Sequence, residues 1–135
     1  MHFRNNFYFL SNMYPCTLKG NLHTYNCAEH AFAYAKCVND KDRATILACK
    51  DGYSAKKAGR IVVLRPDWHS IKLRVMDQVL RMKFHPGTEL SQKLIDTGDL
   101  YLQEDNTWND TFWGVCNGVG QNNLGKILMK IRSQL

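Results

Sequence analysis

Tyr25-Asn26-Cys27-Ala28-Glu29-His30-Ala31-Phe32-Ala33-Tyr34-Ala35-Lys36 decides the fold, because its Ala, Phe and Tyr body with few charges predicts a buried helix. Glu29 and Lys36 are seven residues apart, so about 100° of rotation per residue returns them to nearly the same face. About 10 Å separate them along the axis, and Lys36 leans back toward Glu29 because helical side chains lean toward the N-terminus. A carboxylate and an amine therefore flank a gap about the size of a sugar ring. An amine attacks a sugar's anomeric carbon, and a carboxylate carries its proton.

The same residues have a purely structural interpretation, which the pattern alone leaves open. Glu29 follows Asn26 by three positions, the spacing at which a helix cap and its N3 partner exchange hydrogen bonds. In this interpretation Lys36 marks the solvated end of the helix.

The composition is that of a globular protein with an excess of positive charge. The 135 residues include 44% hydrophobic and 22% charged residues, which is enough to bury a core without cross-links. Eighteen Lys and Arg against twelve Asp and Glu give a formal charge of +6. This charge favours an anionic partner, either nucleic acid or a phosphorylated small molecule. A basic protein without an acidic partner is the alternative that charge alone leaves open.

The cysteines and histidines predict neither a disulfide framework nor a metal site. The chain has five cysteines, an odd number, with no pair spaced as CxxC, and its five histidines do not cluster as ligands. Cysteines used in this way indicate a reducing compartment. The longest apolar run is five residues, Ala31 to Ala35, and the N-terminus lacks the apolar region of a signal peptide. We therefore expect no membrane span and a cytoplasmic location.

Helical patterns outnumber strand patterns, so we expect an α+β fold, a single mainly helical domain over residues 1–135 with a few short strands. Strands are expected at residues 7–10 and 100–104 and on either side of a hairpin turn at residues 19–21. Helices are expected at residues 27–38, 40–49, 55–59 with a Ser54 cap, 68–84, between a Thr88 cap and a Gly98 stop, and 124–135.

Two loops carry side chains suited to ligand binding. Residues 114–123 are rich in Gly and Asn and precede the final helix, so their backbone N–H groups can approach an anion. Their spacing matches no established phosphate motif, and a plain loop with a capping Asn is equally consistent with them. Asp110 lies between Trp108 and Trp113, where a carboxylate and large aromatic rings share one loop.

Two further features lie around residues 56–68. Trp68 follows Pro-Asp in the first turn of a helix, where stacking on a ligand competes with a place in the core. A basic cluster suits phosphate groups, although each member alone also fits a solvated face. Its members are Lys56, Lys57, Arg60 and Arg65.

In their order along the chain, these motifs resemble those of the NADAR family. Phe9-Leu10-Ser11-Asn12-Met13-Tyr14-Pro15 is similar to its opening LSNFYP motif, and Tyr25 to Lys36 is similar to its Y-x-x-x-E-H-x-F-x-x-x-K helix. Ala33 stands where members often have Gln, which leaves the substrate's identity open. The similarity continues to Leu135 through Ala55–Arg60, Trp68, Met76, Lys83-Phe84, Leu94, Thr97-Gly98, Glu104, Asp110, Trp113-Gly114, Gly120, Asn122, Leu124-Gly125, Leu128-Met129 and Ile131-Arg132.

The resemblance implies an N-glycosidase that acts on ribosylated bases or base-like amines without a metal or redox cofactor. Some members are similar to enzymes that cleave phosphorylated riboflavin-pathway intermediates. Others remove ADP-ribose from guanine in nucleic acid, as antitoxins or in viral counter-defence. The resemblance implies Glu29, Lys36, Asp110 and Trp68 as active-site residues. With the basic cluster, it also gives the expected substrate-binding residues Asn12, Lys56, Arg60, Trp113, Gly114 and Asn122.

We expect the substrate to be ADP-ribosylated DNA or RNA, with a phosphorylated ribosyl-base small molecule as the second possibility. A non-catalytic ADP-ribose-binding module is the third, and the joint presence of Glu29, Lys36 and Asp110 disfavours it. In the expected mechanism neutral Lys36 takes the ribose C1′ as an imine, and Glu29 or Asp110 carries the protons. Trp68 would stack on the base or sugar. Burial by neighbours such as Phe32, together with nearby cations, is expected to lower the pKa of Lys36.

Overall fold

Helices dominate the structure, a computed structural model that describes residues 1–135. The strands are two residues long and form two separate two-stranded sheets, so the predicted α+β class with few short strands is confirmed. The chain divides into two units, Asn12–Lys83 and Met1–Ser11 with Phe84–Leu135, which are described in turn. The expectation of one domain over residues 1–135 stays a prediction. None of the helices combines the length and hydropathy that crossing a membrane requires.

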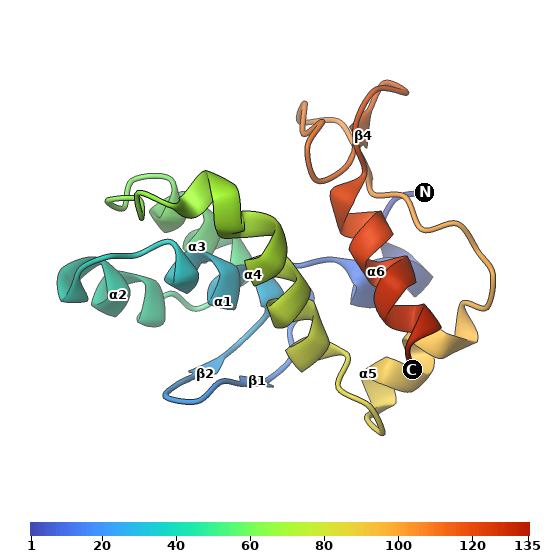
Figure 1. The fold of residues 1–135 in the computed structure, drawn as a ribbon, viewed down its shortest axis with the longest axis horizontal. Coiled ribbons are helices and arrows are strands. Elements are labelled where there is room, and N and C mark those ends of the chain that lie inside the picture. The colour runs from blue at the N-terminus through green and yellow to red at the C-terminus, as the bar shows by residue number, and fades with distance from the viewer. The chain divides into compact units, whose positions relative to one another are not determined.

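In the unit Asn12–Lys83, α1 (Ala28–Ala35) is the central helix. It packs against α2 (Asp40–Leu47), α3 (Gly52–Gly59) and α4 (Trp68–Lys83), as Figure 1 shows. Small side chains on α1 and α3 allow this close approach, and a core cluster forms around them from Ala33, Cys37, Ile46 and Ala55. A hairpin of β1 (Leu18–Lys19) and β2 (Thr24–Tyr25) precedes α1, with Leu18 paired to Tyr25 around the predicted turn.

The ends of α1 differ from the prediction for local reasons. The helix begins after Cys27, whose backbone is extended, so the interpretation of Asn26 as the cap is wrong. The Asn26 side chain instead donates hydrogen bonds to the carbonyls of Cys49 and Lys50, 3.2 and 3.0 Å away. The helix ends at Ala35 rather than residue 38, because Cys37 leaves it to form an antiparallel bridge with Leu64.

The third helix starts three residues earlier than predicted. Asp51 is its cap, and Ser54, which was expected to be the cap, occupies the N3 position. Asp51 Oδ1 accepts from the Ser54 backbone N–H at 2.8 Å, and Ser54 Oγ accepts from the Asp51 N–H at 3.3 Å. This reciprocal pair is a capping box built from an acid and a hydroxyl, a variant of the usual residue order.

The other unit is built on two helices, α5 (Glu89–Asp96) and α6 (Asn123–Ser133), which pack against each other. The predicted Thr88 cap is confirmed, since its hydroxyl accepts from the Ser91 N–H at 3.2 Å. Gly98 follows the helix with φ +60, the left-handed conformation expected of a stop. A short parallel pair, β3 (Asp105–Asn106) and β4 (Val115–Cys116), lies before α6.

The predicted strand at residues 7–10 is wrong, because this segment is part of a 3₁₀ helix, η1 (Asn5–Leu10). The neighbours Phe9 and Leu10 are both buried, whereas adjacent residues of a strand point to opposite faces. Asn5, with φ +53, supplies the left-handed turn that starts the segment.

The predicted strand at residues 100–104 is also wrong, since the nearest strand is β3 (Asp105–Asn106). A side chain takes the place of a partner strand. Asn122 Nδ2 donates to the Leu102 carbonyl at 2.9 Å, and Asn122 Oδ1 accepts from the Glu104 N–H at 3.0 Å. These bonds satisfy backbone groups that a ladder would otherwise use.

Candidate active site

Glu29 lies in the first turn of α1 and is buried, with 8% of its surface exposed. Its backbone N–H donates to the Asn12 carbonyl at 2.9 Å, which holds Asn12 at the start of the helix. The positive end of a helix favours a carboxylate at this position. The next residue, His30, accepts from the Asn26 N–H at Nδ1 and lies 2.8 Å from the Ile46 carbonyl through Nε2, so it has a structural role.

Lys36 caps the C-terminal end of α1, and its side chain is half-buried. Its Nζ lies 5.6 Å from the centre of the Phe32 ring, and a Cβ added at Gly59 would be 3.7 Å from it. Because Gly59 has no side chain, α3 can approach this amine closely. The Lys36 amine therefore lies between the aromatic face of α1 and the end of α3.

The pKa of Lys36 is lowered from its ordinary value, mainly by burial and further by the positive charges of Lys56 and Arg60. The negative charge of Glu29 opposes these effects and raises it. The expected direction of the shift is thus confirmed. The Lys36 amine is therefore influenced by the Glu29 carboxylate, which the spacing of the two residues had paired with it, and by two basic side chains.

Trp68 begins α4 and is buried, with 4% of its surface exposed. Its ring packs against Phe32 with 5.0 Å between ring centres and 59° between planes. Phe32 thus contacts Trp68 and lies below the Lys36 amine. Trp68 and the Lys36 amine thus share Phe32 as a neighbour, while stacking of Trp68 on a base or sugar stays a prediction.

Asn12 belongs to the same unit, and its backbone carbonyl accepts from the Glu29 N–H. Its Nδ2 lies 3.7 Å from the Met76 sulfur, a weak interaction, and its buried Oδ1 accepts no hydrogen bond from the protein. A buried acceptor without a donor is costly, and a hydroxyl-rich ligand supplies donors. Contact between Asn12 and a substrate stays a prediction.

The remaining predicted residues belong to the unit that contains α5 and α6. Asp110 Oδ1 accepts from the backbone N–H groups of Phe112 and Trp113 at 3.2 and 2.9 Å. The backbone of Asp110 is in turn bonded to the side chain of Asn106. One carboxylate oxygen therefore shapes the loop, and the proton-carrying role expected of Asp110 stays a prediction.

Trp113 and Gly114 lie directly after this turn. The Trp113 ring meets Phe112 edge to face, with 4.8 Å between centres, and remains half-buried. Gly114 is buried, and a Cβ there would lie 1.8 Å from Glu104 Oε2, so no other residue fits without displacing Glu104. Gly114 thus permits the pairing of β3 with β4.

Asn122 is buried, and its φ of 54 places it in the left-handed region before α6. Its amide holds Leu102 and Glu104, and it makes no capping bond to the helix. The role seen is therefore that of a structural clamp, and a contact between Asn122 and a ligand stays a prediction.

Six of the ten predicted residues thus share the unit Asn12–Lys83, and four lie in the other unit. Within the first unit, Glu29, Lys36, Lys56 and Arg60 interact electrostatically, and Trp68 joins them through Phe32. No cluster of three or more His, Cys, Asp or Glu side chains could hold a metal ion.

Sequence reasoning gave no role to Lys83, which is 3% exposed at the end of α4. Its Nζ lies 5.7 Å from the centre of the Tyr14 ring. Burial lowers its pKa to about 8, against the smaller opposing influence of the Cys16 and Cys27 thiols. Its position on the apolar face of α4, three residues after Leu80, was the signal that could have identified it.

Lys83→Met should raise the free energy of unfolding at pH 7. Lowering a lysine pKa from 10.5 to about 8 costs the charged form roughly 3 kcal/mol, and Met removes that cost. Between pH 8 and 10.5 the folded lysine is neutral while the unfolded one binds a proton, so the wild type gains stability as pH rises. The difference between the two proteins should therefore shrink over this window in urea unfolding. A constant difference, or an equal gain from Lys57→Met at an exposed site, would contradict this account.

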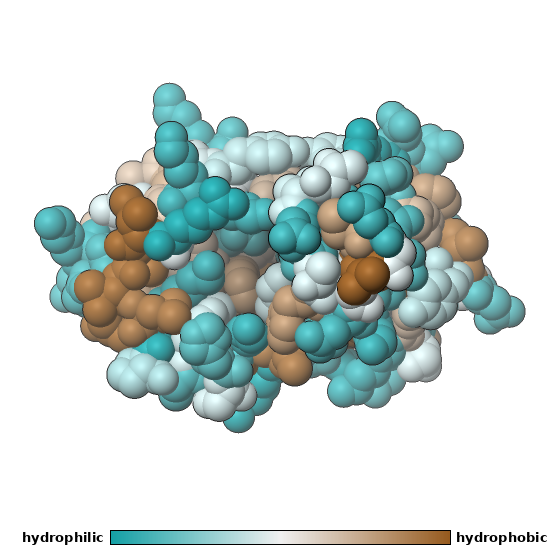
Figure 2. Space-filling model, turned by 90° about the horizontal axis from the view of Figure 1, so that it is seen from above, coloured by the Kyte–Doolittle hydropathy of each residue, from teal (hydrophilic) through white to brown (hydrophobic).

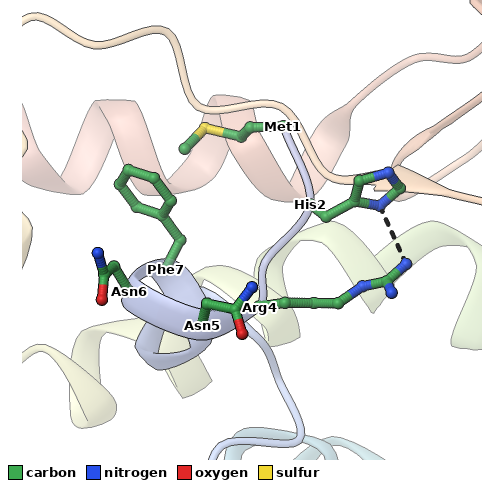
Figure 3. Close-up of a pocket in the computed structure, with 6 residues that line it drawn as sticks. All are labelled: Met1, His2, Arg4, Asn5, Asn6 and Phe7. Carbon is green, nitrogen blue, oxygen red and sulfur yellow. Dashed lines mark hydrogen bonds between the residues drawn. The ribbon is translucent and has the colours of Figure 1, made fainter.

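An open pocket of about 410 Å³ lies at the N-terminal segment of the second unit (Figure 3). Its lining residues are Met1, His2, Arg4, Asn5, Asn6 and Phe7. The Arg4 guanidinium reaches His2 Nδ1 at 3.4 Å on one side of the pocket. None of the predicted site residues lines it.

The chain is similar to known proteins along almost its whole length. The family model of the NADAR domain matches residues 1–135. The NMR structure of the Escherichia coli protein YbiA matches with a TM-score of 0.87 and 32% identity, over 99% of this chain and 83% of that one.

Two curated relatives are similar in sequence. The N-glycosidase YbiA of Shigella flexneri is 38% identical over 124 residues, which cover 90% of this chain and 76% of the relative. The riboflavin biosynthesis protein VVA0006 of Vibrio vulnificus is 34% identical over 130 residues, 94% of this chain, and the match spans only 35% of that longer protein. Since the family model and the relatives cover almost all of it, this chain belongs to the NADAR domain family.

Proposed function

We propose that this chain, an N-glycosidase of the NADAR family, removes ADP-ribose from guanine in DNA or RNA. The observation that carries the proposal is the Lys36 amine, whose pKa is lowered by burial and by Lys56 and Arg60 while Glu29 lies near it. A lysine must lose its proton to become a nucleophile, and this environment favours the neutral form.

The proposed reaction begins with the Lys36 amine. Its lone pair forms a bond to C1′ of the ribose, and the bond from C1′ to the guanine nitrogen breaks. A carboxylic acid, formed when the carboxylate takes the proton that the Lys36 ammonium group loses, gives that proton to the guanine nitrogen, and the neutral guanine remains part of the nucleic acid. The nitrogen now bonded to C1′ gives its own proton to the ring oxygen as the ribose ring opens to an imine, and addition of water then releases ADP-ribose and restores the amine.

Glu29 is the proposed proton carrier within the same unit. Its negative charge acts on the Lys36 amine, and the proposal gives Glu29 the role of delivering a proton to the departing base. It can also stabilise the positive charge that develops at C1′. Asp110 remains the second candidate, with one oxygen bonded to the Phe112 and Trp113 N–H groups.

Charge around Lys36 supports an anionic substrate. Arg60 and Lys57 are exposed at the end of α3, and the chain carries a formal charge of +6. Such side chains can contact the diphosphate of ADP-ribose or the phosphates of a nucleic acid. Reversal of a guanine modification would suit an antitoxin or a counter-defence protein, and this biological role is part of the proposal.

A specific observation favours a second candidate, hydrolysis of a phosphorylated ribosylamine in riboflavin biosynthesis. The Vibrio vulnificus relative is named a riboflavin biosynthesis protein. The same amine and carboxylate would serve this reaction, because it breaks the same kind of C1′–N bond. A small substrate, however, would leave the basic side chains beyond the ribose with less to contact.

Salt distinguishes these two substrate classes. If the substrate is nucleic acid, kcat/KM for an oligonucleotide bearing one ADP-ribosylated guanine should fall steeply as NaCl rises from 50 to 200 mM. With two to three phosphates neutralised, a fall of roughly tenfold to fiftyfold is expected. A mononucleotide with the same modification should lose much less. Substituting Lys56 and Arg60 should flatten the salt slope of the oligonucleotide. Equal cleavage of both substrates at every salt concentration would leave no support for nucleic acid as the substrate.

A further inference from the structure

Four aliphatic side chains are exposed together in the unit Asn12–Lys83. Ile61, Val63 and Leu64, from the segment between α3 and α4, are 85%, 60% and 39% exposed, and Val38 is 40% exposed. We call these four residues the α3–α4 patch. Figure 2 shows hydrophobic side chains gathered at the left of the view, the end at which Figure 1 places α2 and the segment between α3 and α4.

The segment that carries the patch is held in place by hydrogen bonds. The antiparallel bridge between Cys37 and Leu64 sets Val38 opposite Val63. The Val63 N–H donates to Asp42 Oδ2 at 2.9 Å, and the Arg65 N–H donates to the Lys36 carbonyl at 3.0 Å. The backbone is thus fixed at both ends of the run, and the aliphatic side chains project from an anchored segment.

The patch lies next to the backbone of Lys36 and to positive charge. The Arg65 bond to the Lys36 carbonyl joins the segment to the end of α1. Arg60 directly precedes Ile61, is exposed, and acts electrostatically on the Lys36 amine. Lys57 is exposed one helical turn earlier in α3. An aliphatic surface and cations therefore lie together beside Lys36.

We propose that the α3–α4 patch packs against the bases that flank the modified guanine in a nucleic acid, while Arg60 and Lys57 contact the adjacent phosphates. This inference rests on the proposed function and specifies how that substrate is held. Enzymes that act on bases use single-stranded substrate or take the target base out of its stack, and in both cases the apolar faces of neighbouring bases are uncovered. Aliphatic side chains fill such gaps in other nucleic-acid complexes.

Charge and size favour this occupant over a second copy of the chain. Four aliphatic side chains are far fewer than the roughly 20–30 residues a side of a stable protein interface. A second copy would also bring its own Arg60 and Lys57 toward the same positive charges, whereas phosphates neutralise them.

The test compares Ile61→Ser/Val63→Ser with the wild type on two substrates. One is a single-stranded oligonucleotide with one ADP-ribosylated guanine, and the other is the mononucleotide with the same modification. The double variant should raise KM for the oligonucleotide roughly tenfold, because two aliphatic side chains lose their contacts with bases. KM for the mononucleotide should change by less than about twofold, since flanking bases are absent.

Two control variants sharpen the comparison. Leu22→Ser removes a side chain that is 87% exposed in the β1–β2 turn, and it should leave both KM values unchanged. Ile61→Leu/Val63→Ile keeps the patch aliphatic and should retain the wild-type KM for the oligonucleotide.

The possible outcomes distinguish failure of the proposal about the α3–α4 patch from failure of the proposed function. A wild type that does not cleave the oligonucleotide overturns the proposed function and the patch with it. A wild type that cleaves it, with an unchanged KM in the double variant, overturns only the patch. Equal losses on both substrates also overturn it, because the segment would then act through Lys36. Dissociation of a wild-type dimer by the double variant, seen by light scattering, would identify a self-interface instead.

Discussion

Lys36→Ala should reduce turnover to below detection while the chain remains folded. The substitution removes the only group that forms the proposed bond to C1′, so no imine can form. The fold should survive because the Lys36 backbone, which accepts from the Arg65 N–H, is unchanged and the side chain is half-buried. Steady-state assays with a far-ultraviolet circular dichroism spectrum of each protein provide the measurement.

Chemical trapping tests directly whether Lys36 forms a covalent bond to the sugar. Loss of activity in Lys36→Ala tests this bond only indirectly. Borohydride added during turnover should reduce the imine and leave the sugar attached at Lys36, which peptide mass spectrometry locates. Lys41→Ala, at an exposed position in α2, is the matched control and should be trapped like the wild type. An active Lys36→Ala protein would exclude the imine mechanism.

The rate should also depend on pH in a defined direction. Only the neutral Lys36 amine attacks, and burial with Lys56 and Arg60 lowers its pKa. The rate should therefore rise with pH and level off below the ordinary pKa of lysine. Replacing Arg60 with Gln removes one positive charge and should move the rise to higher pH.

Glu29→Gln should lower kcat by roughly 10²-fold or more with little change in substrate binding. Gln keeps the shape of the side chain and cannot release or accept the catalytic proton. Removing the negative charge also removes the influence that raises the pKa of Lys36, so its pKa should fall further. Single-turnover rates and the affinity for substrate separate these effects.

Asp110→Asn is the matched comparison, since Asn retains an oxygen that can accept from the Phe112 and Trp113 N–H groups. If Asp110 only shapes the loop, this variant should keep most of its activity. If it carries a proton, kcat should fall as it does in Glu29→Gln. Loss of folding together with binding in Glu29→Gln would instead give that residue a structural role.

The helices could be predicted because their signals are local. Thr88 and Gly98 bound α5 as their chemistry requires, and the apolar spacing of Leu124 and Leu128 predicts α6. The strand predicted at residues 100–104 is wrong because the hydrogen-bond partner of this segment is distant in the sequence. Residues 100–104 form no strand, and Asn122 bonds the backbone of Leu102 and Glu104 instead, whereas no local pattern indicates a side chain from 18 residues later.

The candidate site was predictable to the extent that one helix contains it. The spacing of Glu29 and Lys36 indicated that the carboxylate and the amine interact, and the lowered pKa of Lys36 followed from its apolar neighbours. The contribution of Gly59 could not be predicted, since it depends on how closely α3 packs on α1. The structural role of Asn122 was not predicted, because a loop rich in Gly and Asn is equally consistent with an anion-binding site.

The most direct test of the proposed function is mass spectrometry of the products from two substrates assayed side by side. One is an oligonucleotide with a single ADP-ribosylated guanine, and the other is a phosphorylated ribosylamine intermediate of riboflavin biosynthesis. The account predicts release of ADP-ribose and an oligonucleotide with unmodified guanine, at a kcat/KM well above that for the ribosylamine. Cleavage of the ribosylamine with an untouched oligonucleotide would contradict it.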